Sequence, residues 1–169
     1  NGMKVRVLSP SCYIRMLHCL PIILLAAIFP RGASAALGGD MESVQADQTE
    51  MNASQRISAA TDNYTVYELQ SPAGTIVREY LSMSGTVFAV AWQGPLLPDL
   101  HQLLGAKFTE YTAAAAARHA DDGRHADHGH LDIQLPDLVV ESNGRVRAFY
   151  GRAYLPQGLP QDVAVTDIK

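Results

Sequence analysis

Cysteine is nearly absent from this sequence of 169 residues, because only Cys12 and Cys19 are present and both lie close to the N-terminus. Small disulfide-stapled domains need several cysteine pairs spread along the chain, so that class is excluded. A packed apolar core must stabilise the fold instead, and 47% apolar residues are enough to build one. At this length a single domain is the expectation.

Long apolar runs and an excess of basic charge are also missing. The apolar stretch Leu20–Phe29 ends after ten residues at Pro30 and Arg31, whereas a membrane-spanning helix needs about 20. The 13 Lys and Arg residues are outnumbered by 17 Asp and Glu residues, for a formal net charge of −4. Because nucleic-acid binding depends on basic surfaces, we expect no nucleic-acid partner.

The N-terminus has the pattern of an export signal. Three basic residues and no acid precede Leu20–Phe29, and the small residues Ala33-Ser34-Ala35 follow it. This order predicts a secretory signal peptide over residues 1–35 that is removed after Ala35. A permanent membrane anchor is the competing interpretation, which the short apolar stretch disfavours. We therefore expect an exported protein, periplasmic or secreted.

Removal of this segment would change the chemistry of the chain. Residues 36–169 contain no cysteine, and nine basic residues face seventeen acidic ones, a formal charge of −8. The mature protein would then have no disulfide, no cysteine nucleophile and no cysteine-ligated metal. Its acidity argues against anionic membrane surfaces, so we expect no membrane association after cleavage.

The residue composition of the mature chain changes near residue 62. Residues 36–62 are polar with sparse apolar residues, and we expect a helix near Glu42–Ser58. Three segments of strand character follow, separated by two connectors of the form Ser-x-x-Gly-Thr, each suited to a type I turn with a left-handed glycine. An antiparallel meander is predicted over Tyr64–Gln70, Thr75–Leu81 and Thr86–Trp92.

The third of these strands is apolar on both faces. Strict alternation would place Phe88, Val90 and Trp92 on one face and the residues between them on the other. This pattern is expected of a central strand covered on both sides, or of one side covered by a partner subunit.

A helix is predicted after this strand. Pro98 suits its first turn, and Gly105 interrupts it. Apolar residues recur along one face at spacings of three and four, at Leu100, Leu104, Phe108, Tyr111 and Ala115.

Residues 118–130 then form a His- and Asp-rich segment with no apolar residue larger than alanine, which predicts a solvated loop. Strand character resumes at Leu131–Leu135 and Leu138–Ser142. Asn143-Gly144 favours a type I′ turn into Arg145–Tyr150. The order of elements predicts an α+β domain over residues 63–169: a single antiparallel sheet, a meander plus a hairpin, with one main helix packed across it, preceded by a short N-terminal helix.

Five short motifs carry a resemblance. The sequence is similar to the secreted proteobacterial family called domain of unknown function 2844. This resemblance implies an exported bacterial protein of one domain, and it supplies no catalytic or binding residues. The motifs are Leu37-Gly38-Gly39-Asp40, Gly74-Thr75-x-Val77-Arg78-Glu79-Tyr80, Gly85-Thr86-Val87-Phe88-Ala89-Val90-x-Trp92-x-Gly94-Pro95, Pro98-Asp99-Leu100-x-x-Leu103-Leu104-Gly105 and Phe149-x-Gly151-x-Ala153-Tyr154-Leu155-Pro156.

The His-rich loop lies outside those motifs and is the candidate metal site. Imidazole and carboxylate groups suit zinc, copper or nickel, and we expect loose binding because a glycine-containing loop loses backbone entropy when it closes on an ion. A solvated linker whose histidines titrate near pH 6.5 is the alternative. The candidate ligands are His119, His125, His128 and His130.

A set of catalytic residues is harder to identify in this sequence than a candidate metal site. Ser84 precedes a glycine, but residue 82 is Ser, so the G-x-S-x-G pattern is not met. His101 has no identifiable third member to orient it as a base. Glu68 and Glu79, on neighbouring strands, are candidates for a carboxylate pair or for ion pairs with arginines. We assign no catalytic and no cofactor-binding residue, and an enzyme of unknown type is the third-ranked hypothesis.

The first hypothesis is a non-catalytic binding domain of the cell envelope that contacts a protein partner through its sheet or its Pro-rich tail. Its basis is aromatic surface beyond what one helix can cover, contributed by Tyr64, Tyr67, Tyr80, Trp92, Phe149, Tyr150 and Tyr154. Loose metal binding is the second.

Overall fold

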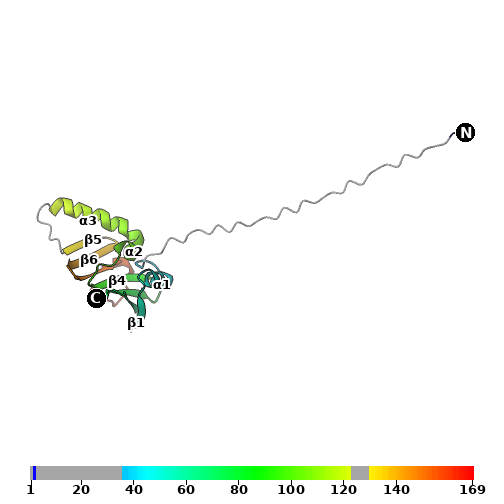
Figure 1. The fold of residues 1–169 in the computed structure, drawn as a ribbon, viewed down its shortest axis with the longest axis horizontal. Helices are drawn as coiled ribbons and strands as arrows, with labels where there is room; N and C mark the ends of the chain where they lie inside the picture. Colours follow the sequence, from blue (N-terminus) through cyan, green and yellow to red (C-terminus); the bar gives the residue numbers. More distant parts are fainter. Residues whose placement is uncertain (1, 3–35, 123–129) are drawn as a thin grey trace. The chain divides into compact units, whose positions relative to one another are not determined.

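One antiparallel sheet organises the protein. The computed structural model describes residue 2, residues 36–122 and residues 130–169, and within them seven strands lie in the order β1-β2-β3-β4-β7-β6-β5 (Figure 1). The strands are β1 (Ser54–Ala60), β2 (Tyr64–Gln70), β3 (Ile76–Ser82), β4 (Val87–Gly94), β5 (His130–Leu135), β6 (Leu138–Arg145) and β7 (Ala148–Tyr154).

Helices precede and interrupt the run of strands. They are α1 (Met41–Glu50), α2 (Leu100–Leu104) and α3 (Phe108–Asp122), with short 3-10 helices η1 (Gly105–Lys107), η3 (Pro156–Gly158) and η4 (Val165–Asp167). The predicted α+β class, with a single antiparallel sheet, a main helix across it and a short N-terminal helix, is confirmed.

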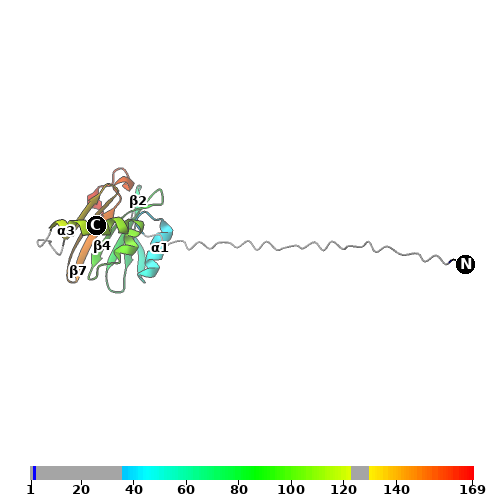
Figure 2. The same ribbon diagram turned by 90° about the horizontal axis from the view of Figure 1, so that it is seen from above.

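Two layers cover the two faces of the sheet. On the face that we call the helical face, Leu100, Leu103 and Leu104 of α2 join Val44 of α1 in a core with inward side chains of the strands. On the opposite face, the tail face, residues 159–169 pack over a second core that contains Ile168. Figure 1 shows α2 and α3 on one side of the sheet and the C-terminus on the other. Seen from above, α1 lies toward β2 and α3 toward β7 (Figure 2).

The meander turns are as predicted. Gly74 and Gly85 adopt φ of +90° and +83°, a left-handed conformation that glycine adopts without steric cost. In each turn the glycine N–H donates to the first serine of the connector, at 2.9 Å to Ser71 and 3.0 Å to Ser82.

Strand β4 is central, as predicted, and all but its last two residues are buried. The predicted assignment of its faces is wrong at its beginning. Tyr80 pairs with Ala89 and Leu81 with Val87, so Phe88 is the extra residue of a β-bulge. Because of the bulge, Phe88 and Ala89 both belong to the tail-face core.

The helix expected near Glu42–Ser58 is shorter than predicted. Asp40 caps α1 by accepting from the Glu42 N–H at 2.9 Å, and the helix ends before Asn52, which adopts φ of +47°. The remainder, β1, pairs with β2 at the sheet edge. An ion pair between Arg56 and Glu68 joins the two strands, a contact that no helical pattern anticipates.

The main helix is divided at Gly105, as predicted, and it continues further than expected. Asp99 caps α2 through the His101 N–H at 2.8 Å. Gly105 has φ of +47° and ψ of −119°, which breaks the helix before α3. The run of alanines has high helix propensity, so α3 extends to Asp122. The expectation of a loop from residue 118 onward is therefore wrong for residues 118–122, and residues 123–129 lie outside the described residues.

The predicted turn at Asn143-Gly144 is wrong. Strand β6 continues through Arg145, which pairs with Ala148, and the turn is Val146-Arg147 with φ of +68° at Arg147. Gly144 serves packing instead, because a Cβ there would lie 2.4 Å from Cδ1 of Phe149. The glycine makes room for the aromatic ring of the paired residue.

Candidate functional site

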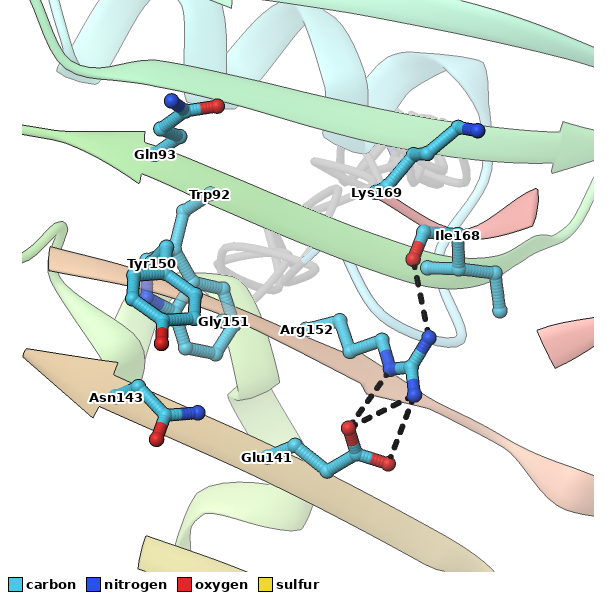
Figure 3. Close-up of a pocket in the computed structure, with 9 residues that line it drawn as sticks. All are labelled: Trp92, Gln93, Glu141, Asn143, Tyr150, Gly151, Arg152, Ile168 and Lys169. Carbon is cyan, nitrogen blue, oxygen red and sulfur yellow. Dashed lines mark hydrogen bonds and ion pairs between the residues drawn. The ribbon is translucent and has the colours of Figure 1, made fainter. Parts of the chain in front are cut away.

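A hollow of about 380 Å³ opens on the tail face, where β4, β7 and β6 lie side by side. Strand register builds it. Gln93, Tyr150 and Asn143 pair in one row across the three strands, and Arg152 and Glu141 pair in the next row on the same face. The lining residues, drawn in Figure 3, are Trp92, Gln93, Glu141, Asn143, Tyr150, Gly151, Arg152, Ile168 and Lys169.

Tyr150 is the exposed aromatic group of this hollow. Its side chain is 57% exposed, and it lies between Gln93 and Asn143 in Figure 3. The Asn143 side chain is positioned by a contact of 2.6 Å between its Oδ1 and Nδ1 of His130. An aromatic ring flanked by amide groups offers apolar contact and hydrogen bonding to the same ligand.

Gly151 and Trp92 also line the hollow, and they pair in the row between the two just described, whose side-chain positions face the helical side. A Cβ at residue 151 would lie 2.5 Å from Cζ2 of Trp92 and 2.5 Å from the Glu141 carbonyl oxygen, so a side chain does not fit. The indole is nearly fully buried, and among the described residues its Nε1 has no hydrogen-bond partner. The glycine therefore makes room for the indole of its paired residue, which belongs to the helical-face core.

Arg152 and Glu141 form the charged wall. The guanidinium makes two parallel bonds to the carboxylate, Nε to Oε2 at 3.0 Å and Nη2 to Oε1 at 3.1 Å. Its Nη1 also donates to the carbonyl oxygens of Val165 at 2.7 Å and Ile168 at 3.3 Å. Bidentate pairs of this kind are strong and directional. Both charges are therefore compensated, and they hold the C-terminal segment in place.

A second clamp holds the end of the same segment. Tyr80 accepts from the Lys169 N–H at 2.9 Å, and Nη1 of Arg78 donates to the Lys169 carbonyl oxygen at 3.2 Å. Glu68 fixes Arg78 through a contact of 2.9 Å to its Nε. Burial raises the pKa of Glu68, but hydrogen bonds from Arg56 and Arg78 outweigh it and hold the pKa below its ordinary value.

Glu68 and Glu79 do not form the carboxylate pair that was one of the two alternatives. They lie on opposite faces, because Glu68 pairs with Arg78 on the tail face while Glu79 is fully buried beside Asp47 of α1. Burial, and then the charge of Asp47, raise the pKa of Glu79 to about 9. Burial also raises the pKa of Asp47, to about 6. Both acids are sealed from solvent and from the hollow.

Of the predicted metal ligands, the structure places two. His119 lies in α3, and His130 begins β5, where its Nδ1 contacts Asn143. His125 and His128 lie outside the described residues. Among the residues that are described, no three His, Cys, Asp or Glu side chains group as a metal site. Metal binding by the loop remains a prediction.

Ser84 and His101, which were considered as hydrolytic residues, make contacts that stabilise the fold. Ser84 lies in the turn before β4, with its Oγ 2.8 Å from that of Ser82. His101 packs edge-on against Phe108, with ring centroids 5.0 Å apart. The structure does not bring these two residues into one site.

The aromatic surface inferred from the sequence is mostly covered. The C-terminal segment packs against Tyr64, Tyr80 and Tyr154 on the tail face, and of the seven aromatic residues only Tyr150 is classed among the exposed large side chains. Sequence reasoning missed Gln93, Asn143 and Arg152 as members of the hollow. No local signal identifies them, because only strand register brings them together.

The chain belongs to the family described as protein of unknown function (DUF2844), whose model matches residues 33–168. No curated protein and no solved structure matches the chain. Within the part of the chain that the structure describes, no helix has the length and apolar character needed to cross a membrane.

Proposed function

We propose that this member of the DUF2844 family is an exported, non-catalytic domain that binds a protein partner of the cell envelope at the tail-face hollow. The export part rests on the signal pattern of residues 1–35. The binding part rests on Tyr150, an aromatic ring that is exposed while the other aromatic residues within residues 36–122 and 130–169 are wholly or partly covered.

The surroundings of Tyr150 favour a protein partner. Val146, at the tip of the same β6–β7 hairpin, is 90% exposed, and the exposed Arg145 and Arg147 flank it. Tyr and Arg are the residue types most enriched where binding energy concentrates in protein interfaces. The matching surface would offer an apolar pocket for Tyr150 or Val146 and acidic groups at its rim.

Burial and pairing of the acids favour binding over catalysis. The two carboxyl groups with strongly raised pKa values, Asp47 and Glu79, are enclosed by the helical-face core. In the hollow, Glu141 and Arg152 satisfy each other and the C-terminal segment. A catalytic site needs a titratable group that can reach substrate, and these groups are already engaged.

Site-specific photo-crosslinking tests this proposal in the exporting bacterium. A photoreactive amino acid at position 150 or 146 is expected to give one discrete adduct with an envelope protein. Met83 provides a matched control, because it is 71% exposed but lies at the β3–β4 turn, at the other end of β4. The same adducts from position 83, or none from positions 150 and 146, would contradict the proposal.

A further inference from the structure

The strongest unexplained feature is the buried acid pair on the helical face. Asp47 and Glu79 are 2% and 0% exposed. Gln102 of α2 donates to Oδ1 of Asp47 at 2.7 Å. Oδ2 of Asp47 and both carboxyl oxygens of Glu79 accept no hydrogen bond from any described residue outside the pair. Buried polar atoms are normally paired, and each unpaired one is costly.

Basic side chains do not balance this pair. Among the described residues, the groups that influence Asp47 are Gln102, Glu79, Ala36 and, unfavourably, the acid Glu50 at the end of α1. Glu79 is influenced by its own burial, by the charge of Asp47 and by a hydrogen bond shared with Asp47. Within the part of the chain that the structure describes, these two adjacent buried acids therefore have no cation beside them.

The backbone of Ala36 reaches this same place. Ala36 is fully buried, and its N–H hydrogen-bonds the Asp47 carboxyl group. The following residues are tied to two elements, because Leu37 donates to the Leu103 carbonyl oxygen at 3.0 Å and Gly38 to that of Val87 at 2.8 Å. The nitrogen of Ala36 is thus held beside Asp47 by the fold itself.

We propose that cleavage between Ala35 and Ala36 creates the missing cation, and that the new α-ammonium group of Ala36 is bound between Asp47 and Glu79 in the mature protein. In the hydrolysis, the C–N bond breaks, the oxygen of water joins the Ala35 carbonyl carbon as a carboxylate, and the released amine is protonated. This inference does not depend on the hollow or its partner.

A comparison of the uncleaved amide with the free ammonium group explains why the cleaved form suits this site. An amide at Ala36 has one N–H donor and no charge, whereas an ammonium group has three donors and a positive charge. Three orphaned carboxyl oxygens lie at the site. Pairing satisfies them and offsets the cost of burying the acids.

Burial of Ala36 also sets the order of events. A peptidase cannot reach the bond once Ala36 is enclosed, so cleavage precedes closure of the helical-face core. The uncleaved chain contains the acids without the cation and is less stable. Removal of the signal peptide therefore completes the helical-face core only after export.

The test uses the full chain, exported and processed, in a matched pair. One member is the natural sequence, and the other carries a single glycine inserted between Ala35 and Ala36, which preserves Ala33-Ser34-Ala35 and moves the amine one residue away. Mass spectrometry identifies the N-terminus of each. An N-terminus other than Ala36 in the natural protein would overturn the proposal.

Amine labelling and stability then provide independent readouts. In native protein the Ala36 amine is expected to acylate at least about tenfold more slowly than the inserted glycine amine, with the difference lost in denaturant. Glu79→Gln should destabilise the natural protein and stabilise the insertion variant, while Glu42→Gln, an exposed acid on α1, should affect both alike. Equal labelling rates, or the same sign for Glu79→Gln in both backgrounds, would refute the proposal. The labelling comparison needs no additional substitution, so it decides even if Glu79→Gln fails to fold.

Discussion

The acidic side chains on the two faces of the sheet have opposite surroundings. On the tail face, Glu68 and Glu141 are each bound by arginine, and those arginines in turn hold backbone carbonyl groups of the C-terminal segment. On the helical face, Asp47 and Glu79 are buried beneath the helices, and none of the basic side chains that the structure describes lies beside them. Arginine ion pairs therefore attach the C-terminal layer to the sheet, whereas the helical layer is attached mainly by apolar packing, together with an ion pair between Lys107 and Asp137. The helical face is the one with an unmet electrostatic requirement.

The largest effect should come from breaking the helical face at its apolar core. Leu104→Ala removes a fully buried side chain of α2, and the lost burial and the cavity are expected to cost about 2–5 kcal/mol of unfolding free energy. Urea denaturation measures this. Leu96→Ala is the control, because Leu96 is more than half exposed and should change stability little. Similar losses from both substitutions would argue against the helical-face core.

Removing the contacts that hold the C-terminal segment on the tail face should lower the unfolding free energy by an intermediate amount. Arg152→Met removes the bonds to Val165 and Ile168 and leaves Glu141 without its cation, at an expected cost of about 1–3 kcal/mol. Limited proteolysis is the more specific measurement, because the C-terminal segment should be cut before the rest of the domain. Arg145→Met, at the exposed hairpin tip, should leave proteolysis unchanged. If the C-terminal segment of Arg152→Met resisted the protease as it does in the natural protein, the Arg152 contacts would not be what holds it.

The pH dependence of stability should differ in sign between the faces, and the glycine-insertion variant isolates the effect. In that variant residue 36 keeps its amide, so the raised pKa of Glu79, from 4.5 to about 9, contributes stability below pH 4.5 that is lost as pH rises toward 9. The lowered pKa of Glu68 contributes stability above 4.5 that is lost as pH falls below it.

Thermal unfolding across pH separates the two contributions. Glu79→Gln should flatten the alkaline side of the profile, and Glu68→Gln the acidic side. In the processed natural protein the alkaline loss should be smaller, since a cation then favours ionised Glu79. An unchanged alkaline side in Glu79→Gln would contradict the assignment.

The smallest effect should come from metal binding at the predicted His-rich site. Zinc, copper or nickel is expected to bind loosely through His119, His125, His128 and His130, and to change stability by less than about 1 kcal/mol. Titration calorimetry on the natural protein and a variant with all four replaced by Asn measures this. Equal heats from both proteins would end the metal hypothesis.

Local patterns predicted the parts of the fold that local chemistry controls. Strand β2 and the turns at Gly74 and Gly85 were predicted because alternation and left-handed glycines act over a few residues. The face assignment of Phe88 and the turn at Gly144 were wrong, because a bulge against β3 and the ring of Phe149 decide them. Both errors have the same origin, a neighbouring strand that the local pattern does not contain.

The candidate sites were less predictable than the fold. Tyr150 was among the aromatic residues considered, but its neighbours Gln93 and Asn143 come from two other strands. Asp47 gave no signal at all, since an acid on a polar helix is ordinarily solvated. Only the packing of α1 against β3 reveals that it is buried.

The amino-acid sequence by itself determined an α+β chain with a meander turned at glycines and a helix broken at Gly105, because these depend on composition, short-range periodicity and glycine's backbone freedom. Tertiary structure alone decided which acids found arginines, which stayed unpaired, and where an aromatic ring stayed exposed. Those outcomes depend on strand register and on which layer covers each face, and residues distant in the chain set both.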